Sequence, residues 1–269
     1  MALRFLDQQP AVVIESSGRR YLLVTDVHLG YELELASKGI RVPPQAPKVT
    51  GYLLGLGERS GAEVLVLMGD VKHRVTGVSW REEVGVRAML EGLSKAFEEI
   101  VVLPGNHDAG ISELIGGLGR VAGSRGIRIG EYWVMHGHTW PLPESLNAKT
   151  YVIGHTHPTA VIRTPEGNVR MKVHLLIEGS RSRLARAVAS RPGYSEAFAV
   201  SRVRGRVRLL ILAHFSPMAP GVDVSALPSS GRTSPLLRSG AFNVLDADVL
   251  STSGELLGRL GELEFEEEA

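Results

Sequence analysis

Five short clusters of aspartate, asparagine and histidine contain the residues of this 269-residue chain that are best suited to chemistry. Each follows an apolar run, and in chain order they are TDVHLG from Thr25, GDVKH from Gly69, GNHD from Gly105, HGH from His136 and GHTHP from Gly154. Such carboxylate, amide and imidazole groups suit Mn, Fe, Zn, Ni or Co rather than Mg or Ca, because imidazole prefers transition metals. In D-x-H and H-x-H, both side chains lie on one side of an extended chain and can reach one ion. The clusters therefore predict a transition-metal site.

For the clusters to form one site, the strands that precede them must end at a common edge. Apolar runs too short for helices, typical of strands buried on both faces, occur at Val64–Met68, Ile100–Leu103, Tyr132–Met135 and Tyr151–Ile153. A hairpin is predicted before them, from Ala11–Glu15 and Arg20–Thr25. Helices are predicted around Val49, Leu53 and Leu56, and after the capping-box pair Ser79 and Glu82, with Leu90, Leu93 and Phe97 at helical spacing. The order predicts an α/β fold whose runs are neighbouring strands of one sheet, with the clusters at their carboxyl ends.

Beyond about residue 160 the pattern changes to strands without clear helices between them. The predicted strands are Ala160–Arg163, Val169–Ile177, Val203–Leu212 and Phe242–Leu250, and Pro217–Ser234 is predicted to be a long loop. The chain is long enough for one large domain or for a domain with a small appendage.

Composition excludes several classes of site. The chain has no cysteine, which excludes disulfides, zinc–thiolate sites and a cysteine nucleophile, and no G-x-S-x-G sequence supports a serine nucleophile. Its start lacks the features of a secretory signal, and no apolar run approaches the ~20 residues needed to span a bilayer. We therefore expect a cytoplasmic protein that makes no membrane contact.

The five clusters resemble the motifs of the calcineurin-like metallophosphoesterases, which run D-x-H, G-D, G-N-H-[DE], H and G-H-x-H in this order. The resemblance implies a two-sheet β-sandwich flanked by helices, in a single domain over residues 1–269. Its motif-bearing core would be 11–180, and the β-rich part 181–269 would complete the second sheet. The resemblance also implies two divalent transition-metal ions, with manganese expected first. One ion would be bound by Asp26, His28 and His157, the other by Asn106, His136 and His155, with Asp70 bridging both and His107 as the catalytic histidine.

His73 narrows the resemblance to one branch of this family. His73 stands three residues after Asp70 and is followed by Trp80, as in the ligase-associated DNA-repair phosphoesterases and their SbcD-related relatives. This similarity implies a catalytic or phosphate-handling role for His73 and possible DNA-repair proteins as partners. We therefore expect hydrolysis of phosphodiester bonds, in nucleic acid or nucleotides, through attack by a metal-bound hydroxide. The oligomeric state is not predicted.

Other interpretations remain open at this stage. The enzyme could instead be a small-molecule phosphomonoesterase or a cyclic-nucleotide phosphodiesterase, or the fold could serve as a binding scaffold without catalysis. His73 could be an ordinary turn residue, and His138 could replace His136 as the ligand. Asp108 would either orient His107 or cap a helix that begins near Ile111. Lys72 could contact phosphate, but an ordinary surface lysine is the favoured interpretation, and His174 and His214 are expected to be structural.

The net charge of +1 conceals a basic segment. Residues 163–208 contain 11 basic and three acidic side chains, a local net charge of +8. Arg202, Arg204, Arg206 and Arg208 alternate with small or apolar residues, so a strand would place them on one face. This Arg row could follow a phosphate backbone, pair with a strand containing Glu262, Glu264 and Glu266, or simply face solvent.

Overall fold

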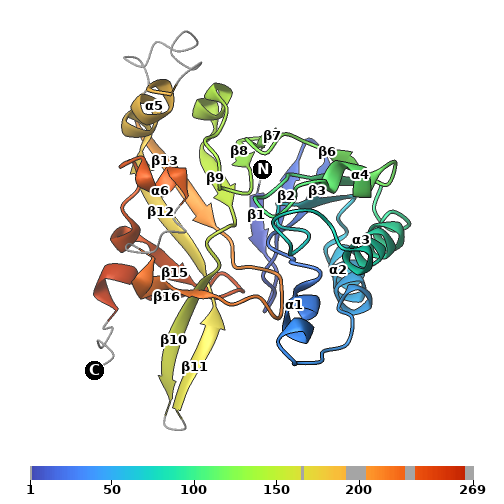
Figure 1. Cartoon of the computed structure of the whole chain (residues 1–269). Helices are drawn as coiled ribbons and strands as arrows, with labels where there is room; N and C mark the ends of the chain where they lie inside the picture. Colours follow the sequence, from blue (N-terminus) through green and yellow to red (C-terminus); the bar gives the residue numbers. More distant parts are fainter. Residues whose placement is uncertain (1, 165–166, 192–203, 228–233, 264–269) are drawn as a thin grey trace.

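The computed structural model of the chain describes residues 2–164, 167–191, 204–227 and 234–263. Two large β-sheets pack face to face, and helices cover their outer faces (Figure 1). Apolar residues of both sheets, including Ile14, Leu23, Val134, Val152 and Leu210, fill the layer between them. The sequence-based expectation of a two-sheet sandwich flanked by helices is confirmed.

The first sheet has six strands in the order β1-β2-β3-β4-β5-β6. The hairpin predicted near the start forms β2 and β3, which are antiparallel, whereas β3 to β6 run parallel. Their bounds are Ala2–Phe5 for β1, Val12–Ser16 for β2, Arg19–Val24 for β3, Val64–Leu67 for β4, Glu99–Val102 for β5 and Arg120–Val121 for β6. All four residues of β4 are buried, as expected for a strand covered on both faces.

Four helices accompany the first sheet: α1 (Tyr31–Ser37), α2 (Ala46–Ser60), α3 (Trp80–Leu93) and α4 (Ile111–Ile115). The predicted capping box begins α3, because the Ser79 side chain accepts from the Glu82 N–H and the Glu82 side chain accepts from the Ser79 N–H. Phe97 was wrongly placed in this helix. The chain turns after Leu93, and the Phe97 ring instead packs against Gly57 of α2.

The second sheet has seven strands in the order β16-β15-β12-β13-β9-β8-β7. Strands β8 (Tyr132–Val134) and β9 (Thr150–Ile153) belong here, so the motif-bearing runs are divided between two sheets. The prediction of one sheet is therefore wrong, because β9 pairs with β13 rather than with β5. The remaining bounds are Ile127–Ile129 for β7, His174–Ser180 for β12, Arg206–Ile211 for β13, Asp248–Leu250 for β15 and Leu256–Arg259 for β16.

The segment after residue 160 contains a helix that the sequence reading missed. Helix α5 (Arg181–Ala189) begins at the Ser180 cap and buries Leu184, Ala185 and Val188 against the second sheet. The short helix α6 (Pro235–Arg238) packs into the same core. The predicted strand Val169–Ile177 is divided into β11 (Gly167–Lys172) and β12. Most of the predicted strand Phe242–Leu250 lies outside β15 and includes a 3-10 turn at Val244–Asp246.

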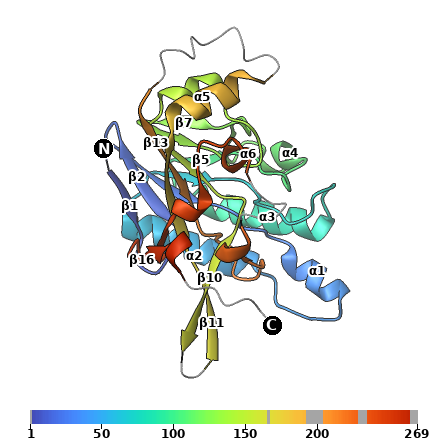
Figure 2. The same ribbon diagram turned by 90° about the vertical axis from the view of Figure 1, so that its left-hand side faces the viewer.

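A small third sheet in the order β11-β10-β14 projects from the sandwich. Strands β10 (Pro158–Thr164) and β11 form a hairpin that extends away from α5, as both views show (Figures 1 and 2). Strand β14 (Val222–Asp223) lies in the predicted loop Pro217–Ser234 and pairs with the start of β10. Among the described helices, none is long and apolar enough to cross a membrane.

Candidate metal centre

The five polar clusters meet where strands of the two large sheets end. Direct backbone contacts join them: the His28 N–H donates to the Asp70 carbonyl at 2.8 Å, and the Gly154 N–H donates to the His136 carbonyl at 2.9 Å. The His155 N–H donates to Asp26 Oδ2 at 3.0 Å, which connects the first sheet to the second. All seven predicted ligands therefore lie in one region, although they come from two sheets.

One group of possible ligand atoms comes from Asp26, His28 and His157, whose atoms lie within 4.8 Å of one another. His157 Nε2 is 3.1 Å from Asp26 Oδ1 and 3.2 Å from His28 Nε2. Asp26 Oδ1 is buried and accepts no hydrogen bond of normal geometry from the described residues. A buried carboxylate oxygen facing two imidazole nitrogens is a donor set suited to a cation.

The second group consists of Asp70, His136 and His155, again within 4.8 Å. Asn106 adjoins it, because its Oδ1 is 3.3 Å from His136 Nε2. His138 is not in this group: its ring centroid lies 5.2 Å from that of His136 and 6.1 Å from that of His155. Of the two alternatives left open, the geometry favours His136.

Asp70 lies between the two groups. Its Oδ2 is 3.7 Å from His28 Nε2, and its Oδ1 is 3.5 Å from His136 Nε2. Each oxygen of this carboxylate thus faces a different group. Two cations about 3.5–4 Å apart commonly share such a ligand.

Backbone carbonyls orient two of the histidines. His136 Nδ1 lies 2.9 Å from the Met68 carbonyl, and His157 Nδ1 lies 3.1 Å from the Pro220 carbonyl. Because a carbonyl can only accept, each Nδ1 carries a proton, and Nε2 is the ring nitrogen left to bind a cation in place of its own proton. This is the arrangement expected of histidines that bind a metal.

The backbone is strained at the same residues. Seven described non-glycine residues have positive φ, and five of them are predicted ligands: Asp26, His28, Asp70, His155 and His157. Such conformations cost of order 1–3 kcal/mol each and persist where the surroundings or a function impose them. Their concentration here marks this edge as functional.

Charge coupling within the centre shifts several pKa values. Burial alone would raise the pKa of Asp26, but His157 and His136 outweigh it and hold that pKa below its usual range. Burial also lowers the pKa of His28 to about 3. Burial opposes protonation of His136, yet the Asp70 carboxylate prevails and raises its pKa to about 9. The carboxylates are therefore charged at neutral pH and available to a cation.

Two glycines allow the motif loops to approach one another. Gly69 has φ of +84°, and a Cβ at this position would lie 2.5 Å from the His136 ring. A Cβ on Gly105 would collide with the Asp70 side chain and backbone. The glycines of the G-D and G-N-H sequences therefore provide the space for Asp70 and His136.

His107 is half-buried beside Asp70. Its backbone N–H donates to Asp70 Oδ1 at 2.9 Å, and its ring Nε2 lies 3.8 Å from Asp70 Oδ2. Its Nδ1 contacts the His73 carbonyl and must be the protonated nitrogen in that contact. The His73 ring in turn lies between Glu34, 2.6 Å from its Nε2, and His28, 3.4 Å from its Nδ1. Both predicted catalytic histidines are thus at the centre.

The sequence profile of the family described as calcineurin-like phosphoesterase matches residues 19–159, just over half of the chain and all five clusters. The chain belongs to the calcineurin-like phosphoesterase family. It is therefore a metal-dependent phosphoesterase, and the two His/Asp groups are suited to the divalent ions that this family uses. No curated protein matches the chain.

Three solved structures are similar to this phosphoesterase. Pseudomonas putida nuclease MPE has a TM-score of 0.50 and 18% identity, covering 90% of this chain and 97% of that one. The protein of unknown function AQ665 from Aquifex aeolicus has a TM-score of 0.35 and 15% identity, covering 51% and 78%. Yfce, a phosphoesterase from E. coli, has a TM-score of 0.33 and 18% identity, covering 56% and 81%. The likeness to the nuclease supports the fold over nearly the whole chain.

Two residues of the phosphoesterase have positions that neither sequence alternative anticipated. Asp108 is buried and accepts hydrogen bonds from the N–H groups of Val71, Lys72 and Gly105, so it ties two motif loops together. It does not cap α4, whose N-cap is Gly110, and its side chain accepts these hydrogen bonds from backbone N–H groups rather than from the His107 ring. Lys72 is fully buried rather than at the surface, and its ammonium donates to the carbonyls of Arg74 and Gly77.

Two residues outside the motifs also support the metal centre, which the sequence did not predict. His214 was expected to be structural, yet its ring stacks on His157 with centroids 4.9 Å apart. Lys172 donates to the carbonyls of His214, Phe215 and Ser216 at 2.6–3.3 Å and so holds the loop after β13 against the centre. Burial lowers the Lys172 pKa to about 8. His174, by contrast, is structural as predicted: its Nδ1 accepts from the Ala213 N–H at 3.0 Å.

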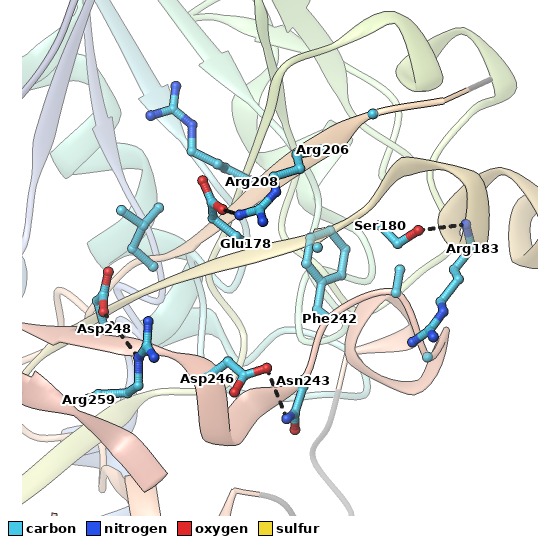
Figure 3. Close-up of a pocket in the computed structure, with 15 residues that line it drawn as sticks. Glu178, Ser180, Arg183, Arg206, Arg208, Phe242, Asn243, Asp246, Asp248 and Arg259 are labelled. Atoms are coloured by element: carbon cyan, nitrogen blue, oxygen red, sulfur yellow. Dashed lines mark hydrogen bonds and ion pairs between the residues drawn. The ribbon is translucent and has the colours of Figure 1, made fainter. Parts of the chain in front are cut away.

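The described part of the Arg row lies elsewhere, at the amino end of β13. Arg206 and Arg208 line a cavity of about 970 Å³, in which Arg206 pairs with Glu178 and Arg259 approaches Asp248 (Figure 3). Strands β12 and β9 occupy both edges of β13, so a Glu-rich strand cannot pair with it there. Glu262 lies in a 3-10 turn, Leu260–Glu262, and Arg202, Glu264 and Glu266 lie outside the described residues. The alternative of an Arg–Glu ladder is therefore wrong for the described part of the row.

Proposed function

We propose that this phosphoesterase hydrolyses phosphodiester bonds of nucleic acids or nucleotides at a centre of two divalent transition-metal ions. The observation that carries the proposal is the position of Asp70, whose two oxygens face separate groups of ligand atoms. When bound, a pair of ions neutralises charge on the phosphate oxygens and lowers the pKa of water. Manganese is the first ion to test, with iron, zinc, nickel and cobalt as alternatives.

The chain's own residues would divide this work. Asp26, His28 and His157 would hold one ion, Asn106, His136 and His155 the other, and Asp70 both. The carbonyls that fix His136 and His157 keep their Nε2 atoms directed at the centre. Because these contacts are made before a substrate arrives, the ligands need little reorganisation.

His107 would act on the leaving oxygen. Its Nδ1 is committed to the His73 carbonyl, so its Nε2, on the Asp70 side, is the nitrogen that can carry a second proton. A protonated imidazole at this position can donate to the leaving group or stabilise developing charge, a contribution typically worth ~10²–10⁴-fold in rate. His73, held by Glu34, would position His107 through its carbonyl and His28 through its ring.

A diester substrate is favoured over a monoester by the space around the centre. The cavity that contains His28, Asp70 and His157 measures about 280 Å³. It adjoins a larger cleft, with which it shares His73 and His107, so a substrate has room to extend on that side. The similar fold of a nuclease agrees with this choice. A place in DNA repair, with repair proteins as partners, stays a prediction.

Chromogenic substrates test the proposal. We expect manganese-loaded protein to hydrolyse bis-p-nitrophenyl phosphate faster than p-nitrophenyl phosphate, and EDTA to abolish both activities. His107→Ala should lower kcat on the diester by at least about 100-fold while two ions remain bound. Equal activity of His107→Ala and wild type would contradict the assigned role, and a preference for the monoester would contradict the substrate class.

A further inference from the structure

A cleft of about 670 Å³ lies beside the metal centre, between α1, the loop after His73 and the start of α3. It shares Glu34, His73 and His107 with the cavity of the centre. A second cavity, of about 1080 Å³, continues along α1, α2 and α3 and shares Trp80 and Arg81 with the cleft. The metal centre, the cleft and the second cavity are therefore neighbours on this face, so a chain-like ligand bound at the centre would meet the cleft next.

Trp80 lines the cleft with an exposed ring. It is 74% exposed, whereas Trp133 is buried in the core of the second sheet. The capping box fixes Trp80 at the first position of α3. Glu82 of that box also accepts from the His73 and Arg74 N–H groups at 3.0 and 2.9 Å. An exposed aromatic ring is thus tied to the loop that bears His73.

Two arginines give the same cleft positive charge. Arg74 and Arg81 are exposed, and neither guanidinium makes an ion pair or hydrogen bond with a described residue. The Glu34 carboxylate, which also lines the cleft, is already engaged by Lys38 and His73. The cavity around Arg206 differs, because two of its arginines, Arg206 and Arg259, have acidic partners. The cleft is therefore the described surface that combines free cations, an exposed aromatic ring and continuity with the centre.

We infer that this cleft binds the unpaired nucleic-acid strand next to the phosphodiester being cleaved, with a base stacked on Trp80 and phosphates on Arg74 and Arg81. The inference rests on the proposed function, since it names the substrate class of the same site. Aromatic platforms beside basic side chains are the usual means of holding a single strand. A base within a duplex keeps its faces stacked on its neighbours, so only an unpaired strand can use the Trp80 ring.

Binding and turnover in Trp80 variants test the inference. We expect Trp80→Ala to weaken binding of a fluorescent single-stranded oligonucleotide about tenfold, because stacking on one aromatic side chain is lost. The ratio of kcat/KM for the oligonucleotide to that for bis-p-nitrophenyl phosphate should fall by a similar factor. Trp80→Phe should restore most of both. Tyr52→Ala is the matched control, since Tyr52 is 52% exposed on the neighbouring helix but does not line the cleft.

Salt dependence tests the arginines. The slope of log K against log salt for single-strand binding should decrease by about 0.7 for each of Arg74→Gln and Arg81→Gln, as expected for one lost phosphate contact. DNA and RNA single strands should both show the Trp80 effect, and a blunt duplex of the same sequence should not. An equal effect of Trp80→Ala on the duplex would overturn the choice of an unpaired strand.

The outcomes separate this inference from the proposed function. Absence of oligonucleotide binding by wild type, or unchanged binding and an unchanged kcat/KM ratio in Trp80→Ala, would overturn the inference even if the diester is hydrolysed. Binding that depends on Trp80, without hydrolysis of any phosphodiester by manganese-loaded protein, would uphold the cleft and overturn the proposed function.

Discussion

Strand β13 has ionisable side chains near each end, and the two groups differ in burial and pairing. Beyond its carboxyl end, His214 stacks on His157, and the Ser216 N–H donates to the Asp26 carbonyl at 2.9 Å. At its amino end, Arg206 pairs with Glu178 in the open cavity of Figure 3. About 17 Å of extended strand separates Arg206 from the last residue of β13.

The contrast shows that charge density alone does not identify the functional end. The side chains of Asp26 and His136 are 0% exposed, whereas those of Arg206 and Glu178 are 80% and 54% exposed. Burying charges without well-aligned partners is costly, and a fold tolerates it mainly where a ligand repays the cost. Exposed ion pairs contribute little and carry no such implication.

Of these variants, Asp70→Asn should impair the metal centre, at the buried carboxyl end of β13, most severely. Loss of the carboxylate that faces both ligand groups should lower kcat/KM on bis-p-nitrophenyl phosphate by at least about 100-fold, because a paired-metal centre stabilises charge by several kcal/mol. Metal content measured by plasma mass spectrometry should fall below two ions per chain. Asp246→Asn makes the same chemical change in the exposed cavity and should leave both quantities unchanged. Two retained ions in Asp70→Asn would contradict its bridging position.

A buried histidine away from the centre should make stability depend on pH. Burial lowers the pKa of His174 to about 4, below the unfolded value near 6.5. Its contribution is therefore fully present above pH 6.5 and is lost as pH falls toward 4, because only the unfolded chain then gains the proton. Between pH 7.5 and 4.5, urea unfolding in EDTA should show a decrease about 2–3 kcal/mol larger for wild type than for His174→Asn. Equal decreases would show that His174 does not titrate as its burial requires.

Glu34→Gln should have a smaller effect, confined to activity. Glu34 contacts His73 Nε2 at 2.6 Å, and loss of a carboxylate that orients an active-site histidine typically costs about 10–100-fold. We expect a fall in kcat/KM near tenfold, since the Glu34 side chain is 40% exposed. Lys38→Met removes the other partner of Glu34 and serves as control. If both variants lost activity equally, the His73 contact would not be the cause.

Glu178→Gln should have the smallest effect. It removes the partner of Arg206 in an exposed pair, so the free energy of unfolding should change by less than about 1 kcal/mol and activity should be unchanged. Urea unfolding and the diester assay check this expectation. A large loss in either would show that the amino end of β13 contributes more than solvated charge.

Local sequence signals were sufficient for the residues of the centre. D-x-H, G-D and G-H-x-H each place their candidate ligands within a few residues of a strand end, and the spacing of D-x-H correctly groups Asp26 with His28. The expectation that both histidines of H-x-H reach one ion is not met, because His157 lies with Asp26 and His28 whereas His155 lies with Asp70 and His136. The capping box at Ser79 is equally local, and α3 begins where it predicts. The strands that precede these residues were found because each contains a short apolar run.

Features that depend on distant pairing could not be predicted in this way. The division of the runs between two sheets follows from β9 pairing with β13, whose paired residues lie 58 positions later in the chain. Asp108 and Lys72 are buried because loops from β4 and β5 meet, which no local pattern encodes. Helix α5 was missed because its many arginines dominate the segment, although Ser180 and the spacing of Leu184 and Val188 indicate a helix.

Anomalous diffraction from crystals grown with manganese tests the central claim most directly. The account predicts two peaks at the manganese edge. One should lie among Asp26, His28 and His157, the other among Asn106, His136 and His155, with Asp70 contacting both. A single peak that excludes Asp70, in crystals of protein that hydrolyses phosphodiesters with manganese, would contradict a two-ion centre.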